Sequence, residues 1–230
     1  MKQLSGILFD FNGTLFFDSL IHMEAFKKVF VKFGKEAPTD EYMTEHIFGR
    51  TNDMIYKQNF NSEADFEECE KFRITKENFY YAICLASPKK MKLVDGAAEL
   101  LDYIKNAGIP YCMATGSGRE EVEFFIKHLG LDRWFSWDNI VYTNGTFRSK
   151  PYPDCYLLAA ERLSLAPSEC LVFEDGTSGM RAANTAGVGG LVAIYEKTLP
   201  SPINDSVKVD SVHHNLLDWK TILENYQLMR

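Results

Sequence analysis

The stretch Gly6–Ser19, GILFDFNGTLFFDS, decides how the rest of the chain is interpreted. Its apolar run ends at Phe9 and fits a short buried strand. The polar residues and the glycine that follow, from Asp10 to Thr14, indicate a tight turn. Ligands of open α/β sheets bind beyond the carboxyl ends of the strands, so Asp10 is the first candidate for chemistry. Taken alone, Asp10 is better explained as an aspartate that starts a turn. A functional assignment therefore needs partners elsewhere in the chain.

The composition is that of an ordinary globular protein. The chain has 230 residues, of which 46% are hydrophobic and 25% are charged, and this length suits one main domain with an insertion. The formal net charge of −7 argues against a nucleic-acid partner, since phosphate-backbone binding needs a basic surface. Asp10 and Asn12 interrupt the first apolar run, so we expect neither a signal peptide nor a membrane-spanning segment there.

The cysteines indicate a reducing compartment. There are five, they are scattered, and they form no CxxC pair: Cys69, Cys84, Cys112, Cys155 and Cys170. We expect buried free thiols and a cytoplasmic protein. A catalytic cysteine is the alternative, but Cys112 and Cys170 lie in strand-like runs, where a small apolar side chain is the expected role.

Helical patterns occupy the chain after the opening strand. Apolar spacing from Ile21 to Phe33 predicts a helix that Asp18 and Ser19 can cap and that ends at Gly34. Three further helices are expected, at 41–46, 52–59 and 63–85. We therefore predict an inserted all-α domain over residues 17–89.

From residue 90 onward, helices alternate with short apolar strands. The expected strands lie at 109–114, 140–142, 171–173 and 191–194, and the expected helices at 97–107, 119–129, 153–163, 180–186 and 216–226. This alternation indicates repeated βα units and a parallel sheet. The sequence thus predicts an α/β main domain flanked by helices, formed by residues 1–16 and 90–230.

Polar clusters follow the expected strands or lie just beyond them. They are Asp10 with Asn12, Thr115 with Ser117, Lys150, and Glu174 with Asp175. Carboxyl ends of parallel strands lie along one edge of a sheet, so these side chains can converge on one crevice. A carboxylate nucleophile, a hydroxyl and an ammonium that hold phosphate oxygens, and acids that hold Mg²⁺ are what phosphoryl transfer requires.

Each cluster also has a purely structural interpretation. Thr115 could cap the helix that follows it, and Lys150 could be a solvated surface lysine. Glu174 and Asp175 could be acids that complement the dipole at a helix start. Taken one at a time, each structural interpretation is the better one. Their joint occurrence in this order favours a phosphoryl-transfer site.

The chain resembles the haloacid dehalogenase superfamily, in particular its branch of β-phosphoglucomutase-like and sugar-phosphate phosphatases. The stretches that carry the resemblance are DFNGTLFFDS (10–19), ATGS (114–117), SKPYPDCYLLAAERL (149–163) and VFEDGTSGMRAANTAG (172–187). The last two are long and specific, and the resemblance covers essentially the whole chain. It implies a Rossmann-like core sheet and a helical cap that closes over the substrate, which matches the inserted segment 17–89.

The resemblance also implies roles for particular residues. Asp10 would be the nucleophile that forms an aspartyl-phosphate, and Thr115 would bind phosphoryl oxygens. Lys150 would neutralise the charge of the phosphate and of Asp10. The expected Mg²⁺ ligands are Asp10, the backbone carbonyl of Asn12, Asp175, and Glu174 directly or through water. Residues expected to shape the turn or to bind substrate are Gly13, Thr14, His22, Arg50, Gly116, Ser117 and Arg119.

Two of these expectations lie in the inserted domain and have alternatives. His22 resembles a histidine of the phosphoglucomutase-like members, but a single histidine on an amphipathic helix is more often a surface or packing residue. Arg50 follows Gly49 in a stretch that resembles the specificity loop of the cap, where an arginine suits a distal phosphate.

Asn12 departs from the family pattern. Phosphatases and mutases of the family carry an aspartate there, which protonates the leaving oxygen and then activates water. An amide has no proton to exchange near neutral pH, although its backbone carbonyl remains a metal ligand. We therefore expect a Mg²⁺-dependent phosphatase of a small phosphorylated metabolite, slowed by Asn12 and monomeric. The alternatives are a β-phosphoglucomutase-like mutase and a weakly catalytic phosphate-binding protein.

Overall fold

The computed structural model describes residues 3–87 and 89–229. The chain divides into two compact units. The first, which we call the core unit, comprises Met1–Phe17 and Lys92–Arg230, and the second, the helical unit, is Asp18–Met91.

The core unit contains a parallel sheet. Its strands are β1 (Gly6–Phe9), β2 (Tyr111–Gly118), β3 (Ile140–Thr143), β4 (Cys170–Glu174), β5 (Gly190–Ile194) and β6 (Ser211–His213). Their order is β3-β2-β1-β4-β5-β6, and each neighbouring pair is parallel. The expected α/β fold with a Rossmann-like sheet is confirmed. The edge strand β6 was not expected, because its three residues are half-buried or exposed and lack an apolar run.

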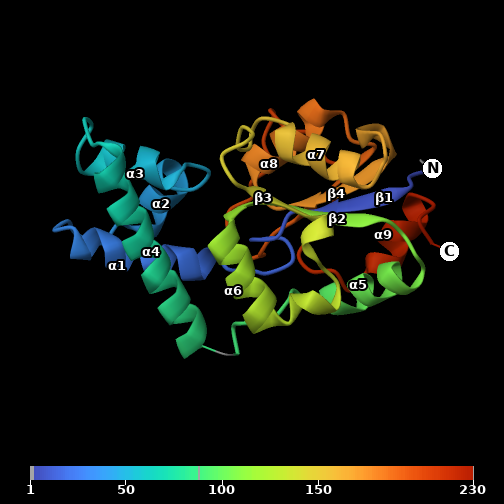
Figure 1. Cartoon of the computed structure of the whole chain (residues 1–230), viewed down its shortest axis with the longest axis horizontal. Coiled ribbons are helices and arrows are strands. Elements are labelled where there is room, and N and C mark those ends of the chain that lie inside the picture. The colour runs from blue at the N-terminus through green and yellow to red at the C-terminus, as the bar shows by residue number, and fades with distance from the viewer. Residues whose placement is uncertain (1–2, 88, 230) are drawn as a thin grey trace. The chain divides into compact units, whose positions relative to one another are not determined.

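Helices cover both faces of this sheet. They are α5 (Ala97–Asn106), α6 (Arg119–Leu129), α7 (Asp154–Arg162), α8 (Thr177–Ala186) and α9 (Trp219–Asn225). Figure 1 shows α7 and α8 on one face and α5, α6 and α9 on the other. Three short 3₁₀ turns join these elements: η1 (Leu131–Arg133), η2 (Trp137–Asn139) and η3 (Pro167–Glu169). Because both faces are covered, the central strands are apolar throughout.

Alternation along the strands builds the two halves of the core. Leu8 pairs in register with Val172, and both belong to a buried cluster with residues of α7 and α8. The next residues, Phe9 and Phe173, point to the opposite face, where their rings stack with centroids 5.1 Å apart. Since β1 lies between β2 and β4, the strand order reverses beside it. Open α/β sheets bind ligands at this point.

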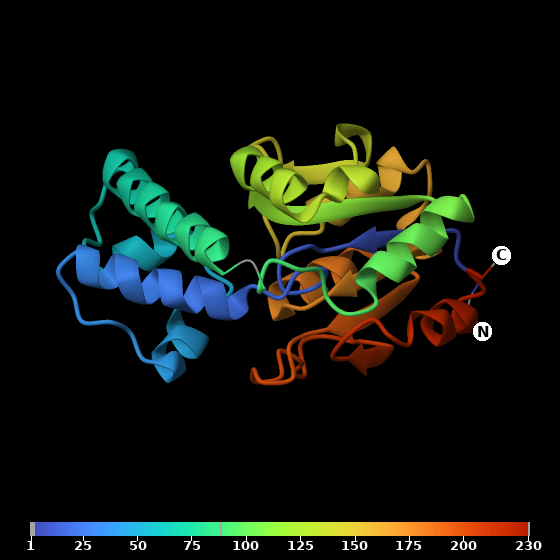
Figure 2. The ribbon, with the colours of Figure 1, turned by 90° about the horizontal axis from the view of Figure 1, so that it is seen from below.

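The helical unit consists of α1 (Ser19–Lys32), α2 (Asp40–His46), α3 (Asn52–Asn59) and α4 (Phe66–Ala86). Helix α4 packs against α1 and α3, as Figure 2 shows for α1 and α4. Aromatic rings pack together in the core of the helical unit: Phe30, Phe33, Tyr56, Phe60 and Phe72. A capping box formed by Asp65 and Glu68 starts α4 at Phe66, three residues later than the apolar pattern predicts.

Asp18 does not cap α1 through its side chain. Its carboxylate is 1% exposed and accepts a hydrogen bond of 2.6 Å from the Tyr80 hydroxyl. It also lies 3.2 Å from Nε2 of His22. The prediction of a local cap was wrong because the carboxylate is used inside the helical unit instead.

Two further expectations can be compared with the structure. All five cysteines are free and buried, as predicted. Within residues 3–87 and 89–229, no helix has both the length and the apolar character that crossing a bilayer requires.

Candidate active site

Two carboxylates end neighbouring strands at the carboxyl edge of the sheet. Asp10 follows β1 directly, and its backbone N–H donates to the carbonyl of Phe173 at 2.9 Å. Glu174 is the last residue of β4. Asp10 is 6% exposed and Glu174 is 2% exposed. The turn expected after Phe9 therefore places Asp10 beside Glu174, at the point where the strand order reverses.

Lys150 joins these two carboxylates. Its Nζ lies 2.6 Å from Oδ1 of Asp10 and 2.7 Å from Oε2 of Glu174, and its side chain is 12% exposed. Burial alone would lower the pKa of Lys150, but the charges of Asp10 and Glu174 outweigh burial and hold it well above its ordinary value. Lys150 is thus a fixed, largely buried cation and not a solvated surface lysine.

The pKa of Asp10 is raised far above its ordinary value. Burial and then repulsion from Glu174 raise the pKa of Asp10 to about 7, against the lowering effects of Lys150 and Thr14. The Thr14 hydroxyl donates to Oδ2 of Asp10 at 3.3 Å. Asp10 therefore holds a proton more tightly than an exposed aspartate does, in a site where the Lys150 ammonium faces both Asp10 and Glu174.

Asp175 completes a set of three carboxylates. Asp10, Glu174 and Asp175 each place a ligand oxygen within 4.8 Å of the other two. Hard oxygen ligands of this kind suit Mg²⁺, and an added divalent cation would relieve the repulsion that raises the pKa of Asp10. The donor set therefore fits the expected ion.

Two glycines make room for these acids. A Cβ atom added to Gly13, whose φ is +78°, would lie 1.9 Å from Oδ2 of Asp175. A Cβ atom added to Gly179 on α8 would lie 2.1 Å from the carboxyl carbon of Glu174. The glycines of the first and fourth motifs are thus required by the close approach of the carboxylates.

Tyr156 is a site residue that the sequence analysis missed. Its hydroxyl donates to Oε2 of Glu174, and the Lys150 ammonium lies 4.8 Å from the centre of its ring. Burial, followed by the charge of Glu174, raises the pKa of Tyr156 well above its ordinary value. With Lys150 and the Gly176 N–H, which donates to Oε1 at 3.1 Å, Tyr156 gives Glu174 three hydrogen bonds. A polar tyrosine on the buried face of α7 was the available signal.

The second motif contributes two hydroxyls. Oγ1 of Thr115 accepts a hydrogen bond of 3.1 Å from the backbone N–H of Ser117. The Ser117 hydroxyl donates to Oδ1 of Asn12 at 2.8 Å. Thr115 does not cap α6, whose first residue is Arg119 and whose N-cap is Gly118 without a side-chain bond. The capping role considered for Thr115 was therefore wrong, because β2 continues past it.

Gly116 lies within β2, and Arg119 is the first residue of α6. Gly116 is exposed. The Arg119 guanidinium lies 4.5 Å from the centre of the Trp137 ring and donates to Glu123 at 2.8 Å. In the part of the chain that the structure describes, these contacts run along α6 and η2 and none joins Arg119 to Asp10.

The helical unit holds the two remaining candidates. The His22 ring stacks on Tyr80 with centroids 4.3 Å apart, beside the buried Asp18. Arg50 donates to the side chain of Gln58 and, at 3.5 Å, to the carbonyl of Glu45. Both side chains are therefore held by partners within their own unit.

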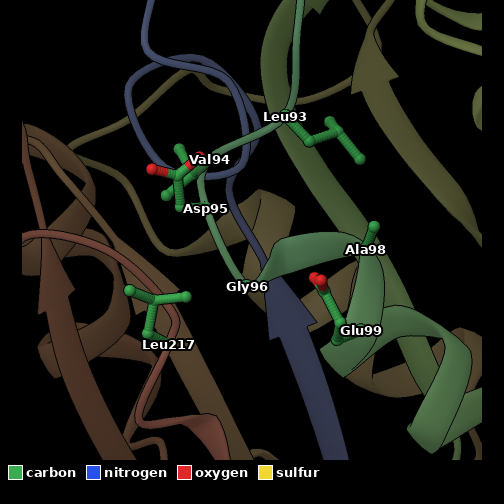
Figure 3. A pocket seen from close by; sticks show the side chains of 7 residues that line it. All are labelled: Leu93, Val94, Asp95, Gly96, Ala98, Glu99 and Leu217. Carbon is green, nitrogen blue, oxygen red and sulfur yellow. The ribbon is translucent and has the colours of Figure 1, made fainter.

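A cavity of about 450 Å³ lies elsewhere in the core unit (Figure 3). It is lined by Leu93, Val94, Asp95, Gly96, Ala98, Glu99 and Leu217. None of the expected site residues lines it, so the candidate site at the carboxyl edge of the sheet is separate from this cavity.

Comparison with known proteins identifies relatives of the whole chain. The family model described as haloacid dehalogenase-like hydrolase matches residues 4–187. A bifunctional riboflavin kinase/FMN phosphatase of Arabidopsis thaliana is 31% identical over 221 residues, which are 95% of this chain but only 55% of that protein. A phosphorylated carbohydrates phosphatase of Thermotoga maritima is 26% identical over 225 residues, covering 96% of this chain and 91% of that protein.

Solved structures agree with this result. The crystal structure of a HAD hydrolase, family IA, variant 3, from Entamoeba histolytica has a TM-score of 0.86 and 32% identity. The match covers 100% of this chain and 99% of that chain.

Proposed function

Because the chain belongs to the haloacid dehalogenase-like hydrolases, we propose that it is a Mg²⁺-dependent phosphatase of a small phosphorylated metabolite, namely a sugar phosphate. One observation carries the proposal: the largely buried Lys150 ammonium bridges Asp10 and Glu174 where the strand order reverses. A fixed cation beside a buried carboxylate is suited to receive a phosphoryl group. The carbohydrate phosphatase among the relatives supports the substrate class.

In this mechanism, Asp10 attacks the phosphorus atom and forms an aspartyl-phosphate. Lys150 balances the charge on Asp10 and on the phosphoryl oxygens. Since Oγ1 of Thr115 already accepts from the backbone of Ser117, the Thr115 hydroxyl hydrogen is available to donate to a phosphoryl oxygen. Gly13 and Thr14 shape the turn after β1, in which the Gly13 N–H donates to the Phe16 carbonyl and the Thr14 N–H donates to the Phe11 carbonyl.

Asp10, Asp175 and the backbone carbonyl of Asn12 would hold Mg²⁺, with Glu174 ligating directly or through water. When bound, the ion neutralises the negative charge gathered on the phosphoryl oxygens and the carboxylates. Glu174 accepts hydrogen bonds from Lys150, Tyr156 and Gly176, so its orientation is set by the protein.

His22, Arg50, Gly116 and Arg119 remain proposed substrate-binding residues, whereas the hydroxyl of Ser117, the fifth residue of that expected set, donates to Asn12. Arg50 and Arg119 would need to exchange their present side-chain partners, Gln58 and Glu123, for a substrate anion. Alanine substitution of either arginine tests this. If the arginine contacts a second phosphate of the substrate, its loss raises KM for a sugar bisphosphate more than for a sugar monophosphate.

Asn12 limits the rate in this proposal. Its amide neither gives nor takes a proton near neutral pH, and general acid–base catalysis is typically worth about 10²- to 10⁴-fold. A mutase needs proton exchange in both directions, so the phosphatase reaction is favoured. The testing experiment is phosphate release from a panel of sugar phosphates with Mg²⁺.

We expect slow release by the wild-type protein, none by Asp10→Asn, and a rise of about tenfold or more in Asn12→Asp, within the range of general acid–base catalysis. Conversion of β-glucose 1-phosphate to glucose 6-phosphate, dependent on a bisphosphate activator, would instead establish the mutase. If neither wild type nor Asn12→Asp turns over any substrate, the proposal is wrong. A higher melting temperature with Mg²⁺ and trifluoroberyllate would then identify a binding protein.

A further inference from the structure

Ser117 and Asn12 form a contact that the proposed chemistry does not yet use. They lie 105 positions apart, at the end of β2 and in the turn after β1. The Ser117 hydroxyl donates to Oδ1 of Asn12 at 2.8 Å, and Ser117 is 7% exposed. The bond is partly shielded from water, because Ser117 is buried and Asn12 is half-buried.

Both partners of this bond are held in place. The backbone N–H of Ser117 is bound to Oγ1 of Thr115 at 3.1 Å. The turn that carries Asn12 is closed by the Gly13 N–H, which donates to the Phe16 carbonyl at 2.7 Å. Asn12 also forms an isolated parallel bridge with Phe16. The Asn12 side chain thus starts from a fixed backbone and meets a fixed donor.

The direction of the bond determines which end of the amide serves the reaction. A carboxamide has one acceptor end and one donor end. Because the carbonyl end of Asn12 is occupied by Ser117, the NH₂ end points away from Ser117. An NH₂ group can donate a hydrogen bond to a departing oxygen, but it cannot release a proton to that oxygen or take one from water.

We propose that Ser117 is a positioning residue that fixes Asn12 as a hydrogen-bond donor to the phosphoryl group, and that the aspartyl-phosphate on Asp10 therefore accumulates during turnover of a substrate whose leaving group needs no proton. This inference rests on the proposed function. It deepens that function by assigning the slow step to hydrolysis of the intermediate.

The two half-reactions differ in their need for a proton acceptor. In the first, an oxygen of Asp10 bonds to phosphorus, the bond from phosphorus to the leaving oxygen breaks, and a poorly leaving alkoxide takes its proton from water. In the second, a water oxygen bonds to phosphorus, the bond to Asp10 breaks, inorganic phosphate leaves, and the proton of the attacking water passes to solvent. A leaving group that needs no proton removes the need for a proton donor in the first half-reaction. The second half-reaction still needs an acceptor for the proton of the attacking water.

The experiment uses para-nitrophenyl phosphate, whose nitrophenolate leaves without protonation, with the full-length protein and Mg²⁺ in a stopped-flow spectrometer. We expect a burst of about one nitrophenolate per protein molecule, followed by a slow linear phase. Intact-protein mass spectrometry of an acid-quenched sample should show one added phosphoryl group that hydroxylamine removes. Asp10→Asn should give neither signal, and Asn12→Asp should lose the burst while its linear phase rises about tenfold or more.

The role of Ser117 is tested by a double-mutant cycle on the rate of the burst. Ser117→Ala should slow the burst roughly three- to tenfold, the effect of one neutral hydrogen bond, and Ser117→Thr should restore it. In an Asn12→Ala background, Ser117→Ala should change the rate by less than about twofold, because its partner is absent. An equal effect in both backgrounds would show that Ser117 acts on the substrate directly and would overturn the positioning role.

The outcomes separate this inference from the proposed function. Nitrophenolate release that is linear from the first turnover, with no phosphorylated protein, overturns accumulation and leaves the phosphatase proposal standing. No release from wild type or from Asn12→Asp overturns both.

Discussion

Replacing Asp10 by asparagine tests the electrostatics of the site through stability. Burial and the charge of Glu174 raise the pKa of Asp10 from 3.8 to about 7. The folded protein therefore binds a proton more tightly at Asp10 than the unfolded chain does. The contribution of Asp10 to the free energy of unfolding falls as the pH rises from about 4 to about 7 and levels off above that.

The magnitude follows from the two pKa values. A change from 3.8 to about 7 corresponds to roughly 4 kcal/mol. This figure is an upper value for Asp10 alone, because Lys150 interacts with both Asp10 and Glu174. We therefore expect Asp10→Asn to raise the free energy of unfolding by about 2 to 4 kcal/mol at pH 8. At pH 4, where Asp10 is protonated in the folded protein, the gain should nearly vanish.

The assay is urea unfolding of EDTA-treated protein between pH 4 and pH 8. All three tryptophans, Trp134, Trp137 and Trp219, lie in the core unit, so their fluorescence reports on the unit that contains Asp10. Added Mg²⁺ should recover stability in the wild type and much less in Asp10→Asn. Equal stabilities at every pH, or a less stable variant at pH 8, would refute the reasoning.

Asp154 provides a control of opposite sign. Its hydrogen bond to the Arg148 side chain lowers its pKa, so the stabilisation it provides is present at neutral pH and is lost as the pH falls through its folded pKa. Asp154→Asn should therefore be slightly less stable than wild type at pH 8. A gain at pH 8 in both variants would point to a general effect of removing negative charge.

Three further substitutions probe separate parts of the molecule. Gly13→Ala should abolish phosphate release with the circular dichroism spectrum unchanged, since its Cβ would lie 1.9 Å from Asp175; ordinary turnover would contradict that placement. Tyr156→Phe removes a donor to Glu174 and should raise the Mg²⁺ concentration for half-maximal thermal stabilisation by about tenfold, whereas an unchanged Mg²⁺ titration would show that Tyr156 serves packing alone. Asp65→Ala breaks the capping box of α4 and should lower the free energy of unfolding in urea by about 1 kcal/mol. A fall of more than about twofold in the rate of phosphate release would contradict a purely structural role for this cap.

The cluster of acids at the edge of the sheet could be predicted because it depends only on the order and direction of the strands. Once helices alternate with apolar strands, the residues after Phe9 and Phe173 must lie at one edge if both strands are parallel. This argument needs no side-chain coordinates, and it placed Asp10, Glu174 and Asp175 together. Lys150 was harder, because it lies in a loop, where only the motif around it indicated that it turns inward.

Contacts set by side-chain direction could not be predicted. The apolar pattern of α7 marks Tyr156 as buried, but the same pattern would place a phenylalanine there, and only the position of its hydroxyl beside Glu174 reveals the bond. The hydrogen bond between Ser117 and Asn12 joins residues 105 positions apart. Its direction depends on where β2 ends, and β2 runs four residues beyond the apolar run that predicts it.

Asp18 shows how a long-range contact outweighs a local rule. An aspartate before an apolar helical pattern predicts a side-chain cap, which is worth about 1 kcal/mol when exposed. Asp18 is buried, however, and a buried carboxylate without donors costs more than a cap supplies. Tyr80, 62 positions away, donates to it at 2.6 Å, and His22 lies 3.2 Å from the same oxygen. The burial that satisfies Asp18 also fixes the His22 ring against Tyr80, so the orientation of a proposed substrate-binding residue follows from the packing of α1 against α4.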